Sequence, residues 1–112
     1  PELGGTIRLA PGGDAKAWGP SAQVYVSVKG MTGPPMPLRA KRLANGPFPL
    51  EFSLSATDAP MRGGPLPGPV MLTVKVDLDG NPMGDDPGAP KLIVEGVTAG
   101  TLDLDLELGA TP

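Results

Sequence analysis

A group of carboxylates in the second half of the chain has the spacing of a cation-binding loop. Asp77, Asp79 and Asn81 stand at alternate positions, and Asp85 and Asp86 follow shortly after. Ca²⁺ binds several hard oxygen ligands that converge within one turn, so this spacing is a candidate calcium site through Asp77, Asp79 and Asp85. A helix–loop–helix calcium loop needs glycine at its sixth position and glutamate at its twelfth, and this chain has proline and glycine there. A polar turn after a strand is the alternative interpretation.

Methionines form a second candidate set, because thioether sulfur is a ligand for Cu(I). Four of the five methionines fall in segments that we expect to be loops, namely Met31, Met36, Met61 and Met83. Copper sites of this kind usually also have His or Cys ligands, and the chain has neither. Methionine also fills irregular gaps in protein interiors, which is the interpretation we favour. A metal-handling domain stays open as an alternative function.

Charged residues form two rows along expected strands. Asp103, Asp105 and Glu107 alternate with leucines, which predicts an acidic row on the outer face of the last strand. Such a row protects an edge strand from aggregation, or it receives a basic segment of a partner. Arg39, Lys41 and Arg42 form the single cationic cluster. Its poor alternation predicts a solvated strand edge, at which an extended peptide could add as a further strand.

The absence of His and Cys from the 112 residues excludes most catalytic and cofactor chemistry. Catalytic triads and dyads that use these residues, thiolate or imidazole metal sites, iron–sulfur clusters and disulfides all require them. No serine lies in a nucleophile motif, so we predict a protein that is not an enzyme and has no cofactor. A net charge of −3, no run of Lys or Arg, and four aromatic residues also argue against nucleic-acid binding.

The chain predicts one domain over residues 1–112 that is built of strands. It contains 17 glycines and 16 prolines, and no segment free of both exceeds ten residues, which is too short for a stable isolated helix. It starts with proline instead of Met and has no apolar run of about 18 residues, so we expect a piece excised or processed from a longer chain, which does not itself contact a membrane. Residues 14–18 are a candidate helical turn, and the Gly/Pro-rich residues 61–69 are expected to form a surface loop.

Alternation of apolar and polar residues predicts about seven strands. The alternation is plain at residues 24–29 and 50–55 and clearest at 70–78 and 101–108, and weaker candidates lie at 6–10, 38–44 and 91–97. Short strands separated by Gly/Pro turns are typical of a β-sandwich. The inward positions predict a core of Ile7, Leu9, Val24, Val26, Val28, Leu50, Phe52, Leu54, Leu72, Val74, Val76, Leu104 and Leu106.

In residues 24–54, the strand VYVSV is followed by GPPMPL, by a cationic strand ending in RL, and by FPLEFSL. This stretch resembles the C-terminal periplasmic domain of the CcmI/CycH family of cytochrome c-type biogenesis proteins. The opening GGTIRLAPG and the turn at residues 79–88 are also similar to family elements, and GPPMPL is the most specific of these matches. The family's middle motif is echoed only by residues 58–61, before the Gly/Pro loop.

The resemblance implies an all-β, Greek-key sandwich that is cupredoxin-like but lacks copper ligands. It also implies a non-catalytic periplasmic interaction module, part of a membrane-anchored protein, that assists apocytochrome c handling or assembly of the haem-ligation complex. A plain structural adaptor is a further alternative. We expect the partner to contact the loop at 33–38, the cationic strand and the turn at 79–88. The candidate partner-binding residues are Gly33, Pro34, Pro35, Met36, Pro37, Arg39, Lys41, Arg42, Asn81 and Met83.

Overall fold

The structure is a computed structural model that describes residues 2–10, 22–31, 37–44, 48–55, 68–77 and 91–108. These residues form seven strands and no helix. The strands are β1 (Leu3–Leu9), β2 (Gln23–Gly30), β3 (Arg39–Ala44), β4 (Leu50–Leu54), β5 (Val70–Asp77), β6 (Lys91–Val97) and β7 (Thr101–Leu108). Each expected strand is present, and the predicted all-β architecture is confirmed.

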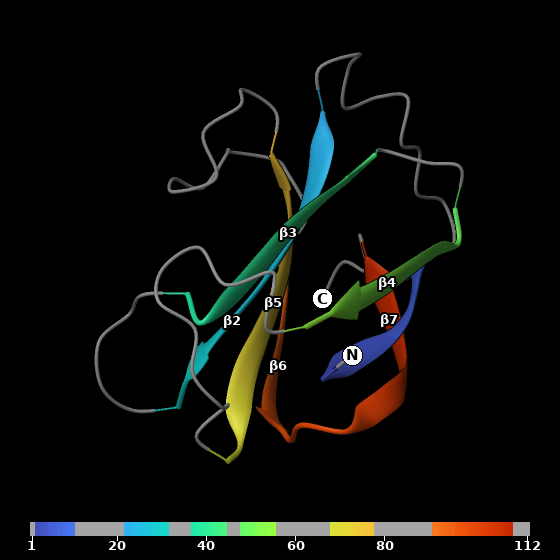
Figure 1. The fold of residues 1–112 in the computed structure, drawn as a ribbon. Coiled ribbons are helices and arrows are strands. Elements are labelled where there is room, and N and C mark those ends of the chain that lie inside the picture. Colours follow the sequence, from blue (N-terminus) through green and yellow to red (C-terminus); the bar gives the residue numbers. More distant parts are fainter. Residues whose placement is uncertain are drawn as a thin grey trace.

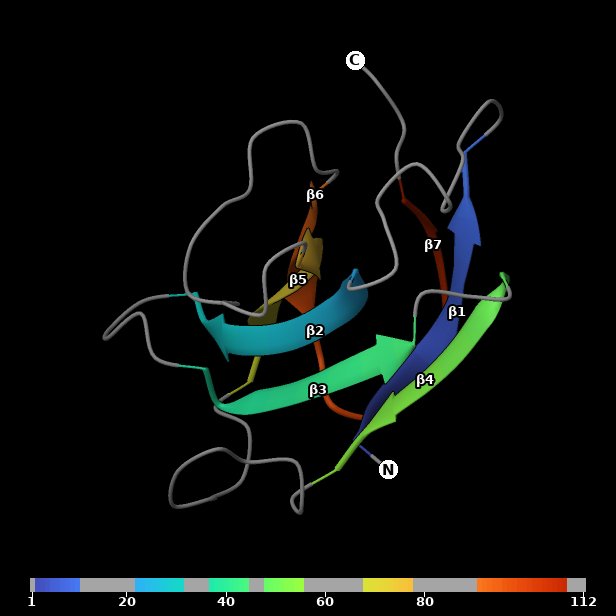
Figure 2. The ribbon, with the colours of Figure 1, turned by 90° about the horizontal axis from the view of Figure 1, so that it is seen from above.

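The strands form two sheets that pack face to face. One sheet has the order β4-β1-β7 and the other has the order β3-β2-β5-β6. Figure 1 shows the two sheets side by side, and Figure 2 shows them as separate layers. Strand β1 lies between its neighbours, antiparallel to β4 and parallel to β7, so its outer face forms the middle of the smaller sheet. The predicted two-sheet sandwich is therefore confirmed.

The core forms because strands β2 and β5 present valine and leucine on alternate positions of the same face. Val24, Val26 and Val28 pair with Val76, Val74 and Leu72 in register, and all six are at most 2% exposed. Directly opposite residues of antiparallel strands lie on the same face of a sheet, so this pairing produces a continuous apolar surface. The smaller sheet covers that surface with Leu3, Ile7, Phe52, Leu54, Leu106 and Leu108.

Three residues of the predicted core are only half-buried. Leu50 and Leu104 pack against the core from its margin, and Leu9 lies near the end of β1. Buried apolar residues that the predicted core lacked are Leu3, Ala10, Ala22, Val70, Val97 and Leu108. The alternation identified the inner face correctly but placed its margins a residue or two away.

Two irregularities in strand pairing lie on either side of the turn between β6 and β7. Leu3 pairs with Thr101 and Gly5 pairs with Leu104, so β7 has one residue more than β1 in this interval. A bulge of this kind turns the neighbouring side chains, and Leu102 is 52% exposed although it continues the leucine pattern of the strand. Strand β6 has a similar shift opposite Val70 and Leu72, near Gly96, whose φ is +79°.

Some expected elements lie outside the described residues. These are the helical turn at residues 14–18, the segment 61–67 of the expected loop, and the turn at 79–88. Across the six described segments, there is no helical stretch with the length and hydropathy of a membrane span.

Candidate functional site

The predicted partner-binding surface is described only in part. Pro37, Arg39, Lys41 and Arg42 belong to the described residues. The remaining members, Gly33, Pro34, Pro35, Met36, Asn81 and Met83, lie outside them. The loop at 33–36 and the turn at 79–88 therefore stay predictions.

The cationic cluster is not the solvated edge that its sequence suggested. Arg39 is 1% exposed, and its Nε and Nη2 donate hydrogen bonds of 2.6 and 3.2 Å to the two carboxylate oxygens of Glu2. Its Nη1 donates a third hydrogen bond, of 2.7 Å, to the carbonyl oxygen of Leu38. Because Glu2 directly precedes β1, this bidentate ion pair joins the two sheets.

The register of β3 explains why Arg39 points inward. Arg39 pairs with Val28 and Lys41 pairs with Val26, so both cations share the face of the buried valines. Strand β3 is at the edge of the larger sheet, and this face of it is directed toward the smaller sheet. Lys41 Nζ accordingly donates a 3.0 Å hydrogen bond to the carbonyl oxygen of Ser53 in β4. Two of the three clustered cations therefore hold the sheets together.

The third cation of the cluster, Arg42, faces the opposite side of β3. Its Nη1 donates a 3.0 Å hydrogen bond to Gln23 Oε1 and lies 3.8 Å from Asp77 Oδ2. Its pairing partner Tyr25 is also paired with Lys75 of β5, whose Nζ lies 5.9 Å from the centroid of the Tyr25 ring. Arg42 is exposed, so it is the member of the cationic strand that remains accessible to a partner.

The two metal alternatives are each represented by one described residue. Met31 follows β2 and is 41% exposed, whereas Asp77 pairs with Gln23 at the other end of that strand and is buried. Met36, Met61, Met83, Asp79 and Asp85 lie outside the described residues. Within the described part of the chain, no group of three or more acidic, His or Cys side chains could hold a metal ion.

A groove of about 640 Å³ crosses the outer face of the smaller sheet. Its floor is the middle strand β1, which contributes Gly4, Gly5 and Thr6, and its sides are β4 and β7. The groove exists because glycine has no side chain and threonine has a short one, while the flanking strands carry longer residues. Glu51 lies on the β4 side, and Asp103 and Asp105 lie on the β7 side.

The register of β1 with β4 and β7 places carboxylates on both sides of the groove. Thr6 pairs with Glu51 on one side and with Asp105 on the other, so two carboxylates flank a hydroxyl. Within the acidic row of β7, which is an edge strand, Asp103 and Asp105 are exposed and Glu107 is half-buried. Glu51, on the β4 side, is exposed as well. Arg8, two residues along β1 from Thr6, is the cationic side chain among the residues that line the groove.

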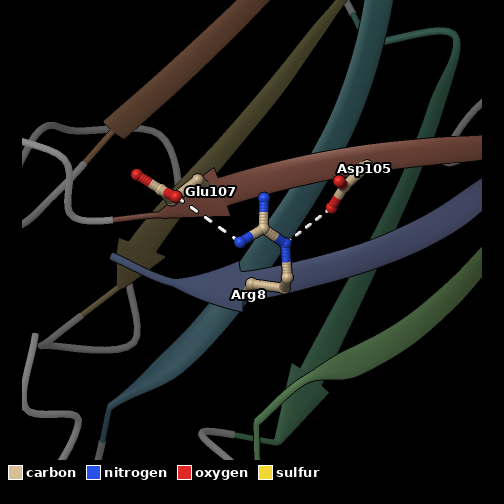
Figure 3. A network of polar contacts seen from close by, with 3 residues as sticks. All are labelled: Arg8, Asp105 and Glu107. Atoms are coloured by element: carbon tan, nitrogen blue, oxygen red, sulfur yellow. Dashed lines mark hydrogen bonds and ion pairs between the residues drawn. The ribbon is translucent and has the colours of Figure 1, made fainter. Parts of the chain in front are cut away.

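Arg8 bridges two members of the acidic row. Its Nε donates a 2.7 Å hydrogen bond to Asp105 Oδ1, and its Nη1 lies 3.5 Å from Glu107 Oε2 (Figure 3). The hydrogen bond to Asp105, followed by the charge of that carboxylate, raises the pKa of Arg8 above its ordinary range. Despite these contacts, the Arg8 side chain remains about half exposed, at 47%.

Comparison with known families identifies the domain. The family model described as the cytochrome c-type biogenesis protein H Ig-like domain matches residues 3–104. The chain belongs to this family. Comparisons with curated proteins and with solved structures gave no significant match.

The family's description of its domain as Ig-like agrees with the two-sheet sandwich of this chain. The resemblance seen in the sequence is confirmed at the level of the family, whereas the cupredoxin-like and Greek-key descriptions stay predictions. The match includes the segments at 33–38 and 79–88 that suggested the family.

Sequence reasoning found the acidic row of this Ig-like domain but not the groove beside it. The row follows from simple alternation along β7, whereas the groove depends on which strands flank β1. The consecutive glycines at positions 4 and 5 and the following threonine were the available signal, because small residues in a central strand leave an open surface between longer neighbours.

Proposed function

We propose that this Ig-like domain is a non-catalytic interaction module that assists cytochrome c maturation. It holds apocytochrome c, or it orients the complex that attaches haem. The observation that carries the proposal is the family match over residues 3–104, which places the chain among cytochrome c-type biogenesis proteins. We further propose that the domain acts in the periplasm as part of a membrane-anchored protein.

The chemistry of the residues supports binding over catalysis. The 112 residues contain no His and no Cys, so no such side chain of this domain can form a covalent bond with the cysteines of an apocytochrome or with haem. The carboxylates of the groove are exposed to solvent, where they suit charge pairing with a partner. The sandwich supplies a scaffold whose two sheets are joined by the ion pair between Arg39 and Glu2 and by the hydrogen bond from Lys41 Nζ to the carbonyl oxygen of Ser53.

Haem-free apocytochrome c is expected to bind this domain more tightly than the haem-bound holoprotein does. We expect a haem-free polypeptide to offer extended segments that a folded holoprotein would bury. We expect the purified domain to bind the haem-free polypeptide with a micromolar Kd and the holoprotein at least tenfold more weakly, an affinity difference of about 1.4 kcal/mol or more. Titration by isothermal calorimetry measures both affinities.

A reduced and alkylated protein of unrelated sequence and matched net charge is the control. It must bind more weakly than haem-free cytochrome c, because generic affinity for unfolded chains would not support a role in maturation. Absence of apocytochrome binding, or equal affinity for all three proteins, would contradict the proposed function.

A further inference from the structure

We propose that the groove over β1 binds an extended cationic segment of the partner protein, and that Arg8 competes with that segment for the same carboxylates. The inference rests on the proposed function, since it names the surface and the chemistry through which the interaction module would hold its partner. It concerns the outer face of the β4-β1-β7 sheet.

The dimensions of the groove fit one extended chain. Neighbouring strands of a sheet lie about 4.8 Å apart, so β4 and β7 are separated by about 9.6 Å across β1. The floor consists of small residues, and the hollow has a volume of about 640 Å³. A peptide that lies along β1 would direct every second side chain into the hollow, where a long cationic side chain can reach carboxylates on either side.

The charges of the groove favour a cationic occupant. Three lining residues are carboxylates and one is a guanidinium. Glu51 and Asp103 form no ion pair with any other described residue, so each is available to a lysine or arginine of the partner. The side chain of Leu102, 52% exposed, adds an apolar contact at the same end of β7 as Asp103.

The spacing of the acids favours an extended partner with alternate cations. Residues two apart on a strand lie about 6.7 Å from each other, and this is the spacing of Asp105 and Glu107. An extended peptide with lysines at every second position has the same repeat. The bulge shifts Asp103 relative to this repeat and brings it toward Gly4, where the floor has no side chain.

Arg8 occupies part of this surface as an intramolecular ligand. It comes from the strand that forms the floor, and it satisfies Asp105 and Glu107 through exposed contacts (Figure 3). Exposed ion pairs contribute little to folding, so the guanidinium can be displaced by a partner cation at small cost. Removing Arg8 should therefore strengthen binding, which is the opposite of what a partner-binding arginine would do.

The test uses a fluorescent nine-residue peptide with lysine at alternate positions and threonine between them. We expect Asp103→Asn to weaken binding about threefold, and Glu51→Gln combined with Asp103→Asn to weaken it about tenfold. Arg8→Gln should tighten binding about threefold, because Asp105 and Glu107 become available. All affinities are measured by fluorescence anisotropy at low and at physiological salt, and they should fall as salt increases.

Matched variants outside the groove separate local pairing from net charge. Glu95→Gln removes an exposed carboxylate from β6, and Lys29→Gln removes a cation from β2, both on the other sheet. Each should change the Kd by less than about 1.5-fold, since neither side chain lines the groove and exposed charges are screened by salt. Unfolding by urea checks that every variant is folded.

Equal effects of Arg8→Gln and Lys29→Gln would overturn the competition by Arg8. Equal changes in Kd for Asp103→Asn and Glu95→Gln would overturn the assignment of the binding site to the groove. Equal affinity for the alternating peptide and for a control peptide with its lysines in one block would also overturn it. Undiminished apocytochrome binding by the Glu51/Asp103 double variant would also overturn the groove while leaving the proposed function intact. Failure of the wild-type domain to bind apocytochrome would overturn the proposed function instead.

Discussion

Glu2→Gln is expected to lower the free energy of unfolding by about 3 kcal/mol, because it removes the carboxylate that pairs with a buried guanidinium. The Arg39 side chain is 2% exposed, and both oxygens of Glu2 accept its hydrogen bonds. Glutamine keeps the shape but offers one acceptor and no charge. Breaking a buried pair from one side usually costs about 3–5 kcal/mol, and the 25% exposure of Glu2 favours the lower end of this range.

Urea unfolding of Glu2→Gln, compared with that of the control variant Glu51→Gln, measures this loss of unfolding free energy. Glu51→Gln makes the same chemical change at an exposed position of β4 and should alter the free energy of unfolding by less than about 0.5 kcal/mol. The loss in Glu2→Gln should persist at high salt, because buried pairs are screened less than exposed ones. Equal losses for the two variants would show that the ion pair between the sheets does not stabilise the fold.

Gly5→Ala is expected to lower the free energy of unfolding by about 3 kcal/mol, because the added methyl group has no space. An ideal Cβ at position 5 would overlap the carbonyl oxygen of Leu104 and contact the Cβ of the same residue. The obstacle is backbone in β7, which pairs directly with Gly5 beside the bulge. Relief would require β7 to move away from β1 and lose pairing in the smaller sheet.

Gly100→Ala is the comparison that separates crowding from backbone conformation. Gly100 has a φ of +97° and open space around an added Cβ, so alanine there should cost only about 1 kcal/mol. Thermal and urea unfolding of both variants give the difference. A loss in Gly5→Ala no larger than that in Gly100→Ala would contradict the close approach of β1 and β7.

The clearest strands were predictable because period-two alternation of apolar and polar residues is plain along β2, β4, β5 and β7. In β2, the alternation alone predicts that Val24, Val26 and Val28 are buried, and this prediction requires no information about the partner strands. The start of β1 was not predictable in this way, because glycine at positions 4 and 5 is unfavourable in strands and hides the pattern. Pairing with β4 and β7 on both sides overrides that preference.

The burial of Arg39 could not be inferred from the sequence around it. Three cations within four residues resemble a solvated edge, and the decisive partner, Glu2, lies 37 positions away in the chain. Inward-pointing charges are a known way to protect edge strands, but the pairing depends on which residue of the other sheet faces them. The exposure of Leu102 has a similar cause, since a one-residue bulge reverses a face that strict alternation would keep.

The candidate site was predictable in its charges and not in its shape. Asp103, Asp105 and Glu107 follow from alternation alone, and the structure places them on the outer face of an edge strand. Their position beside a glycine-floored groove requires β1 and β7, the first and last strands of the described chain, to be neighbours. Parallel pairing between such distant segments has no local signal in the sequence.

The most direct test of the central claim, that this domain acts by binding a partner, is a titration of the ¹⁵N-labelled domain with haem-free cytochrome c, followed by amide NMR shifts. We predict saturable shifts concentrated at Thr6, Arg8, Glu51, Asp103 and Asp105, with holocytochrome c producing none at the same concentrations. Saturable shifts confined to another surface would contradict the groove and retain the interaction module. An unchanged spectrum up to the highest apocytochrome concentration reached in the titration would contradict the central claim.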